Sequence, residues 1–397
     1  MTKNTKNEIS IVLGGPAGAG IQTIEAILTQ TLKSAGLHVF SSQEYMSRVR
    51  GGSNSVEIRA SRVPVRAFVD RIDIFIPFDQ ATRERLHGRC HEQTLVAGDP
   101  EKLLPGDSYF ELPLQKLAQE AGHKNLANTI ASGFLVGLMA LDVSFLEATL
   151  EQKFRQQDAS LRDQNLVAAR VGWKVGSQAA ADRPPLFSTA VAGNRAERMF
   201  LNGHQAVGLG AIAGGCSFIS SYPMSPSTGV LTFLAKQARE FGIVVEQAED
   251  EISAINMGIG SWYAGGRAMV TTSGGGFALM TEGVSLAGIV ESPMVIHIAQ
   301  RPGPGTGLPT RTEQGDLDLA LYAGHGEFPR AILAPGTLED AVLCAALAFD
   351  MADAAQTPVF ILTDQYLLDS YYDVAELPLP KKPPASHIVE TAADFMS

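Results

Sequence analysis

Short apolar runs recur along the chain, and stretches with helical spacing separate them. The runs are Ile9–Leu13, His38–Phe40, Ile72–Pro77, Thr94–Ala97, Cys216–Ser221, Ile243–Glu246, Ala268–Thr272, Met294–Gln300 and Val359–Thr363. Apolar runs of this length between helices are typical of buried strands in parallel sheets. We therefore predict an α/β fold with mainly parallel sheets.

The length of 397 residues is enough for two such domains. Small residues and a Pro-Pro pair at 176–196 predict a linker. We place a first α/β domain at residues 1–175, the linker at 176–196, a second α/β domain with a parallel sheet at 197–370, and a tail at 371–397.

Composition disfavours several classes of partner. The 42 acidic and 31 basic residues give a net charge of −11, which argues against nucleic-acid binding. The longest nearly apolar stretch, about twelve residues, is shorter than the roughly twenty of a membrane-spanning helix. The N-terminus lacks the pattern of a secretory signal. Three cysteines are too few for an iron–sulfur cluster, which usually needs four. We expect a cytoplasmic protein with no metal or cluster site of its own.

A glycine cluster, GGPAGAG at 14–20, stands between a predicted strand and a helix at Ile21–Ala35. Backbone N–H groups and the helix dipole at such a turn can cradle an anion, although a tight turn without ligand explains the pattern equally well. The spacing does not match G-x-G-x-x-G, because the third glycine would fall on Thr23, and this weakens a nucleotide-dependent dehydrogenase hypothesis. The candidate anion-binding residues are Gly15, Gly18, Gly20 and Arg50.

In the second domain, polar residues follow directly on predicted strands. Tyr222, Pro223 and Ser225 come after one strand, and Arg301 comes after another. The carboxyl ends of parallel strands form the usual ligand edge of a sheet. An arginine there can bind a carboxylate through two parallel hydrogen bonds. A capped proline turn remains an alternative for the first segment, and His297, inside a strand, is interpreted as a core residue.

Glu251 precedes a helix whose apolar residues Ile252, Ile255, Ile259 and Trp262 form one face. Because Glu251 shares that side, its carboxylate is expected to be buried, which is costly without a partner. Glu249 and Asp250 are explained as solvated acids at the helix N-terminus. Glu251 is therefore either a functional residue or another helix-end acid.

Five sequence blocks in the second domain occur in a fixed order. They are G-H-Q-A, Y-P-M-S-P-S-T, A-E-D-E-I-S-A-I-N-M, S-G-G-G-F-A-L-M-T-E and Q-R-P-G-P-G-T-G-L-P-T-R-T-E-Q-G-D-L. In this order they resemble the α subunits of 2-oxoacid:ferredoxin oxidoreductases. The first domain resembles the γ domain of the same family, and its position before the α-type domain is similar to fused subunits of the 2-oxoglutarate enzymes. Together the two resemblances cover about residues 8–370.

The resemblance implies a thiamine diphosphate enzyme that decarboxylates a 2-oxoacid, passes electrons to ferredoxin and releases acyl-coenzyme A, in some relatives in reverse. 2-Oxoglutarate is the first choice of substrate, with pyruvate or a branched-chain 2-oxoacid as alternatives. By motif position, Glu251 matches the glutamate that binds N1′ of the cofactor's pyrimidine, with Tyr222 and Pro223 beside it. Ser225, Arg301 and Thr310 match positions that hold the substrate, and the first glycine loop becomes a candidate site for coenzyme A. Ser225 departs from the family's threonine, and His204-Gln205 depart from its Asn-Glu.

The metal-binding G-D-G that holds the cofactor's diphosphate has no counterpart at Gly98-Asp99, Gly106-Asp107 or Gly315-Asp316. The resemblance therefore implies a β subunit that carries Mg²⁺, the diphosphate pocket and at least one 4Fe–4S cluster, in a dimer of heterodimers or larger. In the family the chain normally continues into a further α/β domain after the α-type one, and for this sequence that domain is either absent, truncated or supplied by another polypeptide. The alternative is a catalytically silent scaffold or anion-binding subunit that retains only the fold.

Overall fold

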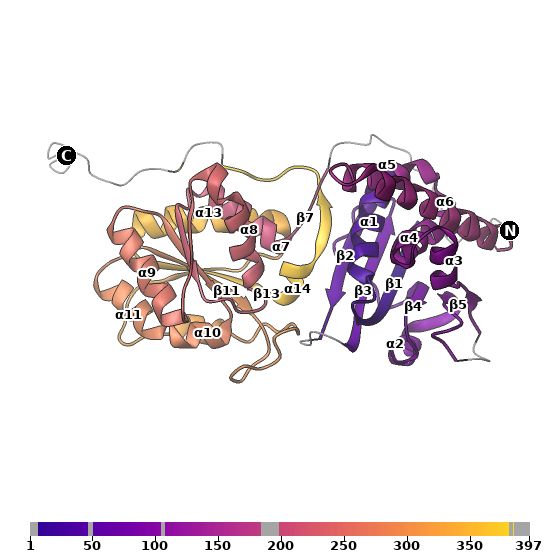
Figure 1. The fold of residues 1–397 in the computed structure, drawn as a ribbon. Helices are drawn as coiled ribbons and strands as arrows, with labels where there is room; N and C mark the ends of the chain where they lie inside the picture. Colours follow the sequence, from indigo (N-terminus) through magenta and orange to yellow (C-terminus); the bar gives the residue numbers. More distant parts are fainter. Residues whose placement is uncertain (1–6, 47–50, 105–107, 184–197, 381–383, 385–397) are drawn as a thin grey trace. The chain divides into compact units, whose positions relative to one another are not determined.

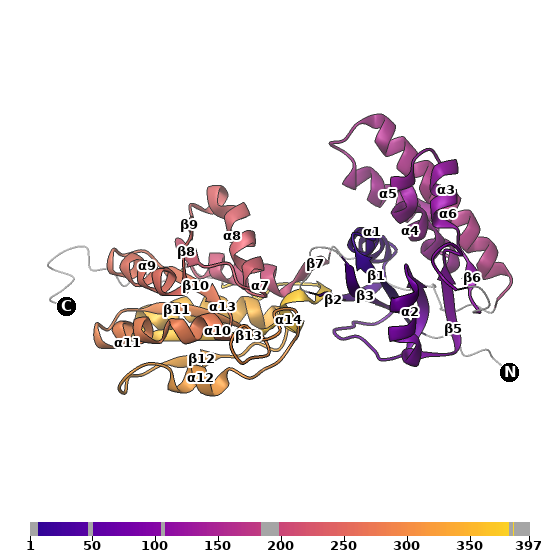
Figure 2. The same ribbon diagram turned by 60° about the horizontal axis from the view of Figure 1, so that its bottom comes forward.

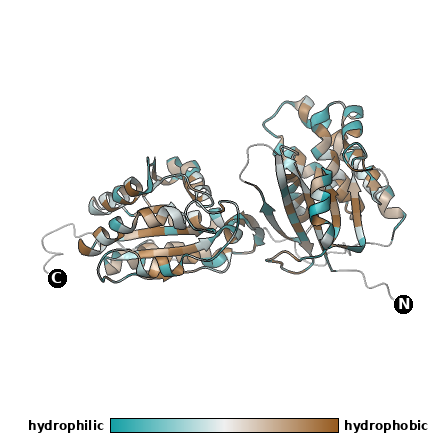
Figure 3. Cartoon of the chain, turned by 90° about the horizontal axis from the view of Figure 1, so that it is seen from below, coloured by the Kyte–Doolittle hydropathy of each residue, from teal (hydrophilic) through white to brown (hydrophobic). Residues whose placement is uncertain are grey.

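The computed structural model describes residues 7–46, 51–104, 108–183, 198–380 and 384. The chain divides into two compact units (Figure 1). The first comprises Met1–Phe200 with Tyr371–Ala375, and the second comprises Leu201–Ser370 with Glu376–Ser397. In each unit, apolar residues gather along the strands and the helix faces that cover them (Figure 3).

The first unit is built on an eight-stranded sheet with the order β6-β5-β4-β1-β3-β2-β14-β7. Its strands are β1 (Glu8–Ala17), β2 (His38–Glu44), β3 (Gly51–Ser61), β4 (Ile72–Pro77), β5 (Cys90–Gly98), β6 (Phe110–Glu111), β7 (Met199–Asn202) and β14 (Tyr371–Val374). Its helices are α1 (Ile21–Ser34), α2 (Gln80–Leu86), α3 (Leu114–Glu120), α4 (Ala127–Leu138), α5 (Val143–Lys153) and α6 (Ala159–Ala181).

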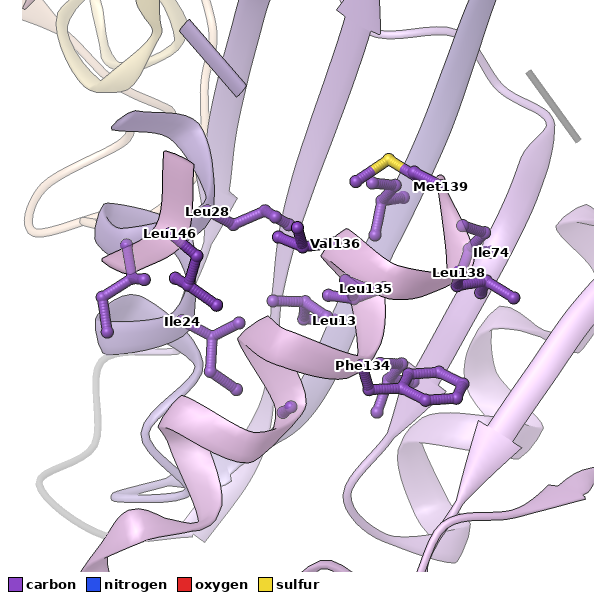
Figure 4. Close-up of a cluster of buried hydrophobic side chains, with 14 of the residues drawn as sticks. Leu13, Ile24, Leu28, Ile74, Phe134, Leu135, Val136, Leu138, Met139 and Leu146 are labelled. Atoms are coloured by element: carbon purple, nitrogen blue, oxygen red, sulfur yellow. The ribbon is translucent and has the colours of Figure 1, made fainter. Parts of the chain in front are cut away.

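The two faces of this sheet are buried against different helices. Leu13 and Ile74 point into a core that includes Ile24 of α1 and Phe134 of α4 (Figure 4). Their sequence neighbours Val12 and Phe75 belong to a smaller cluster with Leu86 of α2 on the opposite face. Helix α2 lies across the sheet from α1 and α4 (Figure 2). Alternate residues of a strand face opposite sides, which explains why these runs are apolar throughout rather than alternating.

The predicted parallel sheet is wrong for this unit, whose sheet is mixed. Strand β1 pairs in parallel with β4, but β3 pairs antiparallel with both β1 and β2, and β14 pairs antiparallel with β2. Residues 45–50 alone separate β2 from β3. A connection this short joins antiparallel strands, because a parallel pair needs a crossover of a dozen or more residues. Strand β3 begins at Gly51, directly after the candidate anion-binding residue Arg50.

The predicted domain boundaries also differ from the observed elements. Helix α6 continues to Ala181, so the boundary at 175 and 176 falls inside it. A side-chain carbon at Gly176 would lie 2.0 Å from the carbonyl oxygen of Phe134 in α4, so this glycine permits close helix packing rather than starting a linker. Residues 184–196 of the expected linker lie outside the described residues. The expected tail begins with strand β14.

The second unit contains a parallel six-stranded sheet with the order β12-β13-β11-β10-β8-β9. Its strands are β8 (Phe218–Ser221), β9 (Val244–Gln247), β10 (Ala268–Thr272), β11 (Met294–Gln300), β12 (Ala331–Leu333) and β13 (Pro358–Asp364). Its helices are α7 (Gly203–Ala213), α8 (Thr228–Phe241), α9 (Glu251–Tyr263), α10 (Gly274–Leu279), α11 (Thr281–Ile289), α12 (Leu317–Tyr322), α13 (Leu338–Ala355) and α14 (Gln365–Asp369). This confirms the parallel sheet predicted for the second domain.

Helices cover both faces of the second sheet. Helices α8 and α13 pack against one face together with α7, and α9, α10 and α11 pack against the other (Figure 1). All strands are parallel, so the segments after β8, β9, β10 and β11 emerge at one edge. No helix in the described part of the chain is long and apolar enough to span a bilayer.

Candidate active site at the strand ends of the second unit

A proline turn and an arginine meet at the carboxyl edge of this sheet. Arg301 follows β11 directly and is 7% exposed. Its guanidinium donates to the carbonyl oxygen of Ser225, in the turn after β8, and to that of Thr306, 2.9 Å away in its own loop. Burial lowers the pKa of Arg301, while the negative charges of Asp316 and Glu251 raise it. The arginine therefore joins the two segments that sequence analysis singled out separately.

Glu251 occupies the first position of α9 and is 3% exposed. Asp250 caps the helix by accepting a hydrogen bond from the N–H of Ser253 at 2.6 Å, and Glu249 is exposed. Ile255, Ile259 and Trp262 are buried on the same side, as predicted, whereas Ile252 is 49% exposed and does not belong to that face. The expectation of a buried Glu251 beside solvated helix-end acids is therefore confirmed.

Two carboxyl groups lie against a glycine triplet, Gly274–Gly276, which follows β10. A side-chain carbon at Gly276 would lie 2.6 Å from Oε1 of Glu251 and 2.2 Å from Oγ1 of Thr272. A side-chain carbon at Gly274 would lie 2.3 Å from both carboxylate oxygens of Asp316. Oε1 of Glu251 and Oδ2 of Asp316 are buried and have no hydrogen-bond partner among the described residues. The triplet thus leaves space for two carboxyl groups, and each has one buried oxygen available to a further group.

Asp316 is a site residue that the sequence interpretation missed. Gly315-Asp316 does not match the metal-binding G-D-G, and no other role was predicted for this pair. Its backbone N–H donates to the side-chain oxygen of Gln300 at 3.0 Å, immediately before Arg301. The sequence contained a signal for Asp316, because this residue belongs to the Q-G-D-L ending of the same block that contains Arg301.

The other predicted residues of this unit occupy different environments. Ser225 is exposed, Tyr222 is 41% exposed and Pro223 is half-buried. Thr310 is half-buried in the loop after Arg301, which folds back because the N–H of Leu308 donates to the carbonyl of Pro302 at 3.0 Å. The structure thus brings Ser225 and Arg301 into direct contact through a backbone carbonyl, and places Thr310 on the same loop as Arg301.

His297 is a core residue, as predicted. Its ring nitrogens are 2.7 Å from Oγ1 of Thr271 and 2.8 Å from Oγ1 of Thr363. Burial lowers its pKa to about 3, so the ring is neutral. His204 bonds Asp369 at 3.0 Å through Nε2, and Gln205 completes a capping box with Asn202, so these two departures from the family pattern stabilise α7.

The glycine cluster of the first unit forms a tighter turn than expected. Strand β1 extends to Ala17, so only Gly18–Gly20 lie between strand and helix. Gly18 and Gly20 have φ angles of 91° and 81°, which favour glycine. A cavity of about 340 Å³ lies on the Gln22 and Tyr45 side of the turn, and another of about 590 Å³ lies on the Lys102 and Asn128 side. Both touch Gly18, neither is lined by Gly15, and Arg50 lies outside the described residues.

Substitution of Gly276 by alanine is expected to lower catalytic efficiency roughly tenfold to a hundredfold, because the added methyl group displaces Glu251 or Thr272. The matched control is Gly260→Ala, whose methyl group meets no atom within 4 Å. Steady-state kinetics and thermal unfolding should be measured on both variants. Equal activity of Gly276→Ala and the wild type would show that the position of Glu251 is not critical.

Comparisons with known proteins agree with this arrangement. Residues 10–175 match the family described as pyruvate ferredoxin/flavodoxin oxidoreductase, and residues 209–394 match its thiamine diphosphate-binding family. A 2-oxoacid:ferredoxin oxidoreductase subunit alpha from Sulfolobus is 32% identical over 96% of this chain and 69% of its own length. The 2-oxoglutarate synthase subunit KorA from Archaeoglobus fulgidus is 42% identical over 46% of this chain and 53% of its own length.

A solved structure shares the fold over nearly the whole chain. The 2-oxoglutarate:ferredoxin oxidoreductase from Magnetococcus marinus, with 2-oxoglutarate, coenzyme A and succinyl-CoA bound, has a TM-score of 0.85 and 30% identity. The match covers 95% of this chain and 66% of that one. The two units therefore define the class of α/β oxidoreductase subunits with a thiamine diphosphate-binding domain. The chain belongs to the family of 2-oxoacid:ferredoxin oxidoreductase alpha subunits, which form part of an oxidoreductase complex.

Proposed function

We propose that this chain is the fused γ–α subunit of an enzyme that oxidatively decarboxylates a 2-oxoacid to acyl-coenzyme A and CO₂, with electrons passed to ferredoxin, and that the reaction is reversible. The observation that carries the proposal is the buried Glu251 beside the glycine triplet, at the same sheet edge as Arg301. A buried carboxyl group with a free oxygen needs a bound partner to offset the cost of its burial.

The residues present fit the pyrimidine end of thiamine diphosphate. Oε1 of Glu251 is free to bond a ring nitrogen, and a side chain at Gly276 would fill the space beside it. When bound, thiamine diphosphate supplies a carbon nucleophile and an electron sink for decarboxylation. Glu251 would share a proton with the ring nitrogen. Tyr222 and Pro223, in the turn after β8, would line the cofactor site.

Arg301 would hold the carboxylate of the 2-oxoacid, with Ser225 and Thr310 shaping the pocket. A guanidinium binds a carboxylate through a planar donor pair, which fixes the keto carbon relative to the carboxylate. In the structure the guanidinium donates to two backbone carbonyls, and its further N–H groups would bind the substrate carboxylate. 2-Oxoglutarate is our favoured substrate, because the Archaeoglobus and Magnetococcus relatives bear that name.

Coenzyme A would bind at the glycine turn of the first unit, through Gly18 and Gly20, with Gly15 and Arg50 as further candidates. The two cavities on either side of the turn give room for an extended ligand. A β subunit would supply Mg²⁺, the diphosphate pocket and the 4Fe–4S cluster, in a dimer of heterodimers or larger. Among the described residues no group of three His, Cys, Asp or Glu side chains could hold a metal ion.

The test is to purify the chain alone and in complex with a β-type subunit of the same family. We expect no decarboxylation from the chain alone with thiamine diphosphate and Mg²⁺. The complex should reduce ferredoxin in a reaction that depends on a 2-oxoacid and coenzyme A. Comparing kcat/KM for 2-oxoglutarate, pyruvate and a branched-chain 2-oxoacid then determines the substrate. A folded complex that is inactive with all three would favour the silent scaffold.

A further inference from the structure

Asp316 is a charged residue at the sheet edge for which the proposed chemistry has no role. Its carboxylate lies against Gly274, and Glu251 lies against Gly276, at the other end of the same triplet. Two loop contacts fix it there. Its own N–H donates to Gln300, and Nε2 of the nearby Gln314 donates to Asp364 at the end of β13, 2.6 Å away.

The charges around Asp316 act in opposite directions. Arg301 lowers the pKa of this carboxyl group, whereas burial and the neighbouring Glu313 raise it, and the pKa remains above its ordinary value. The negative charges of Asp316 and Glu251 in turn raise the pKa of Arg301. The hydrogen bonds of the guanidinium nevertheless go to Ser225 and Thr306, so Asp316 acts on it through space rather than through a bonded ion pair.

An anion bound to Arg301 would change this balance. The bound carboxylate cancels the positive charge that favours ionised Asp316, while burial and Glu313 remain. A carboxylate in that position becomes easier to protonate. Oδ2 is buried and accepts no hydrogen bond from the described residues. No donor group therefore has to move away when a proton binds to this oxygen.

We propose that Asp316 is a positioning residue for the carboxylate subsite at Arg301: ionised, it balances the arginine charge, and it takes up one proton from the buffer when a 2-oxoacid binds. The inference rests on the proposed role of Arg301 in substrate binding. The proton converts the Asp316 carboxylate to a neutral carboxyl group, so the net charge of the subsite with its bound anion stays balanced. The protonated group can then donate a hydrogen bond.

Proton linkage gives the proposal a measurable signature. At acid pH Asp316 is already protonated, so binding takes up no proton. Between the pKa of Asp316 in the free site and its higher pKa in the site with bound anion, binding takes up one proton, and the affinity for the 2-oxoacid falls by up to about tenfold per pH unit. Above both pKa values the uptake ends. A residue that only supported the loop would change affinity or stability without this slope.

The experiment is calorimetric titration of 2-oxoglutarate, and of pyruvate, into the complex freed of thiamine diphosphate, so that the bound acid is not turned over. Titrations in buffers with different ionisation enthalpies give the number of protons taken up. The variants are Asp316→Asn and the matched control Asp318→Asn, which changes an exposed acid two residues away on α12. Glu313→Gln removes a charge that raises the pKa of Asp316, so it should move the onset of uptake to lower pH.

We expect uptake approaching one proton in the wild type and in Asp318→Asn, and none in Asp316→Asn, which should bind with little pH dependence. Wild-type binding without uptake, or unchanged uptake in Asp316→Asn, would overturn the role of Asp316 while leaving the proposed function intact. If Asp316→Asn does not assemble, an uptake profile in Glu313→Gln identical to the wild type overturns it instead. Failure of the wild type to bind any 2-oxoacid would overturn the proposed substrate site and this inference with it.

Discussion

Replacement of Glu251 by glutamine is expected to lower turnover by about a hundredfold or more while the complex still assembles. Glutamine keeps the size of the side chain beside Gly276 but cannot share a proton with a ring nitrogen in the same way. The measurement is hydrogen–deuterium exchange at C2 of thiamine diphosphate in the assembled complex, together with cofactor affinity.

The matched control is Glu249→Gln, because Glu249 is an exposed acid two residues earlier. It loses the same charge near the start of α9 and should exchange at the wild-type rate. If Glu251→Gln also exchanges at the wild-type rate, Glu251 is a structural helix-end acid, and the cofactor's proton transfer must be supported elsewhere.

Arg301→Lys should reduce transition-state stabilisation by about 2–4 kcal/mol, with effects on both KM and kcat. An ammonium group cannot present the planar donor pair that fixes a carboxylate. Because Arg301 also joins the loop at Thr306 to the turn at Ser225, the lysine variant should hold the substrate less well and place it less accurately.

Arg330→Lys separates this substrate effect from loss of structure. Arg330 also donates to two backbone carbonyls, those of Ala320 and Ala323, but it stands before β12, at the opposite edge of the sheet. Both variants should lose comparable stability, and only Arg301→Lys should lose activity. Reduced assembly of Arg301→Lys with normal kinetics in the remaining complex would refute a substrate role and indicate an interface role.

Sequence patterns predicted the elements and their burial correctly where burial alone determines the structure. The runs at Ala268–Thr272 and Met294–Gln300 are β10 and β11 with the same bounds, because strands buried on both faces are apolar throughout. Glu251 could be predicted as buried because its position on the face of α9 follows from helical spacing. Four of the five ordered blocks lie at the ends of β8, β9, β10 and β11, at the sheet edge that forms the site, whereas G-H-Q-A begins α7.

Other features depend on contacts that local patterns do not encode. Strand β3 begins with two glycines, and its place between β1 and β2 follows from a short connection rather than from its composition. Strand β12 has three residues, too few for a periodic signal. Asp316 became a site residue only when its loop folded back against Gly274, a contact between residues 42 positions apart. The opposing effects of Arg301 and Glu313 on its pKa likewise exist only in the folded loop.

Strand β14 is synthesised long after β2, the strand with which it pairs. It pairs with β2, and its Asp373 accepts hydrogen bonds from Arg198 and from the N–H of Val39, yet it is made only after residues 201–370. At about 5–20 residues per second, β2 waits for some tens of seconds for this neighbour. During that time β2 offers an open edge that other strands could join. A gene divided after codon 200 would make this exposure permanent, so the first unit produced separately is expected to associate less through β2 when β14 is supplied with it.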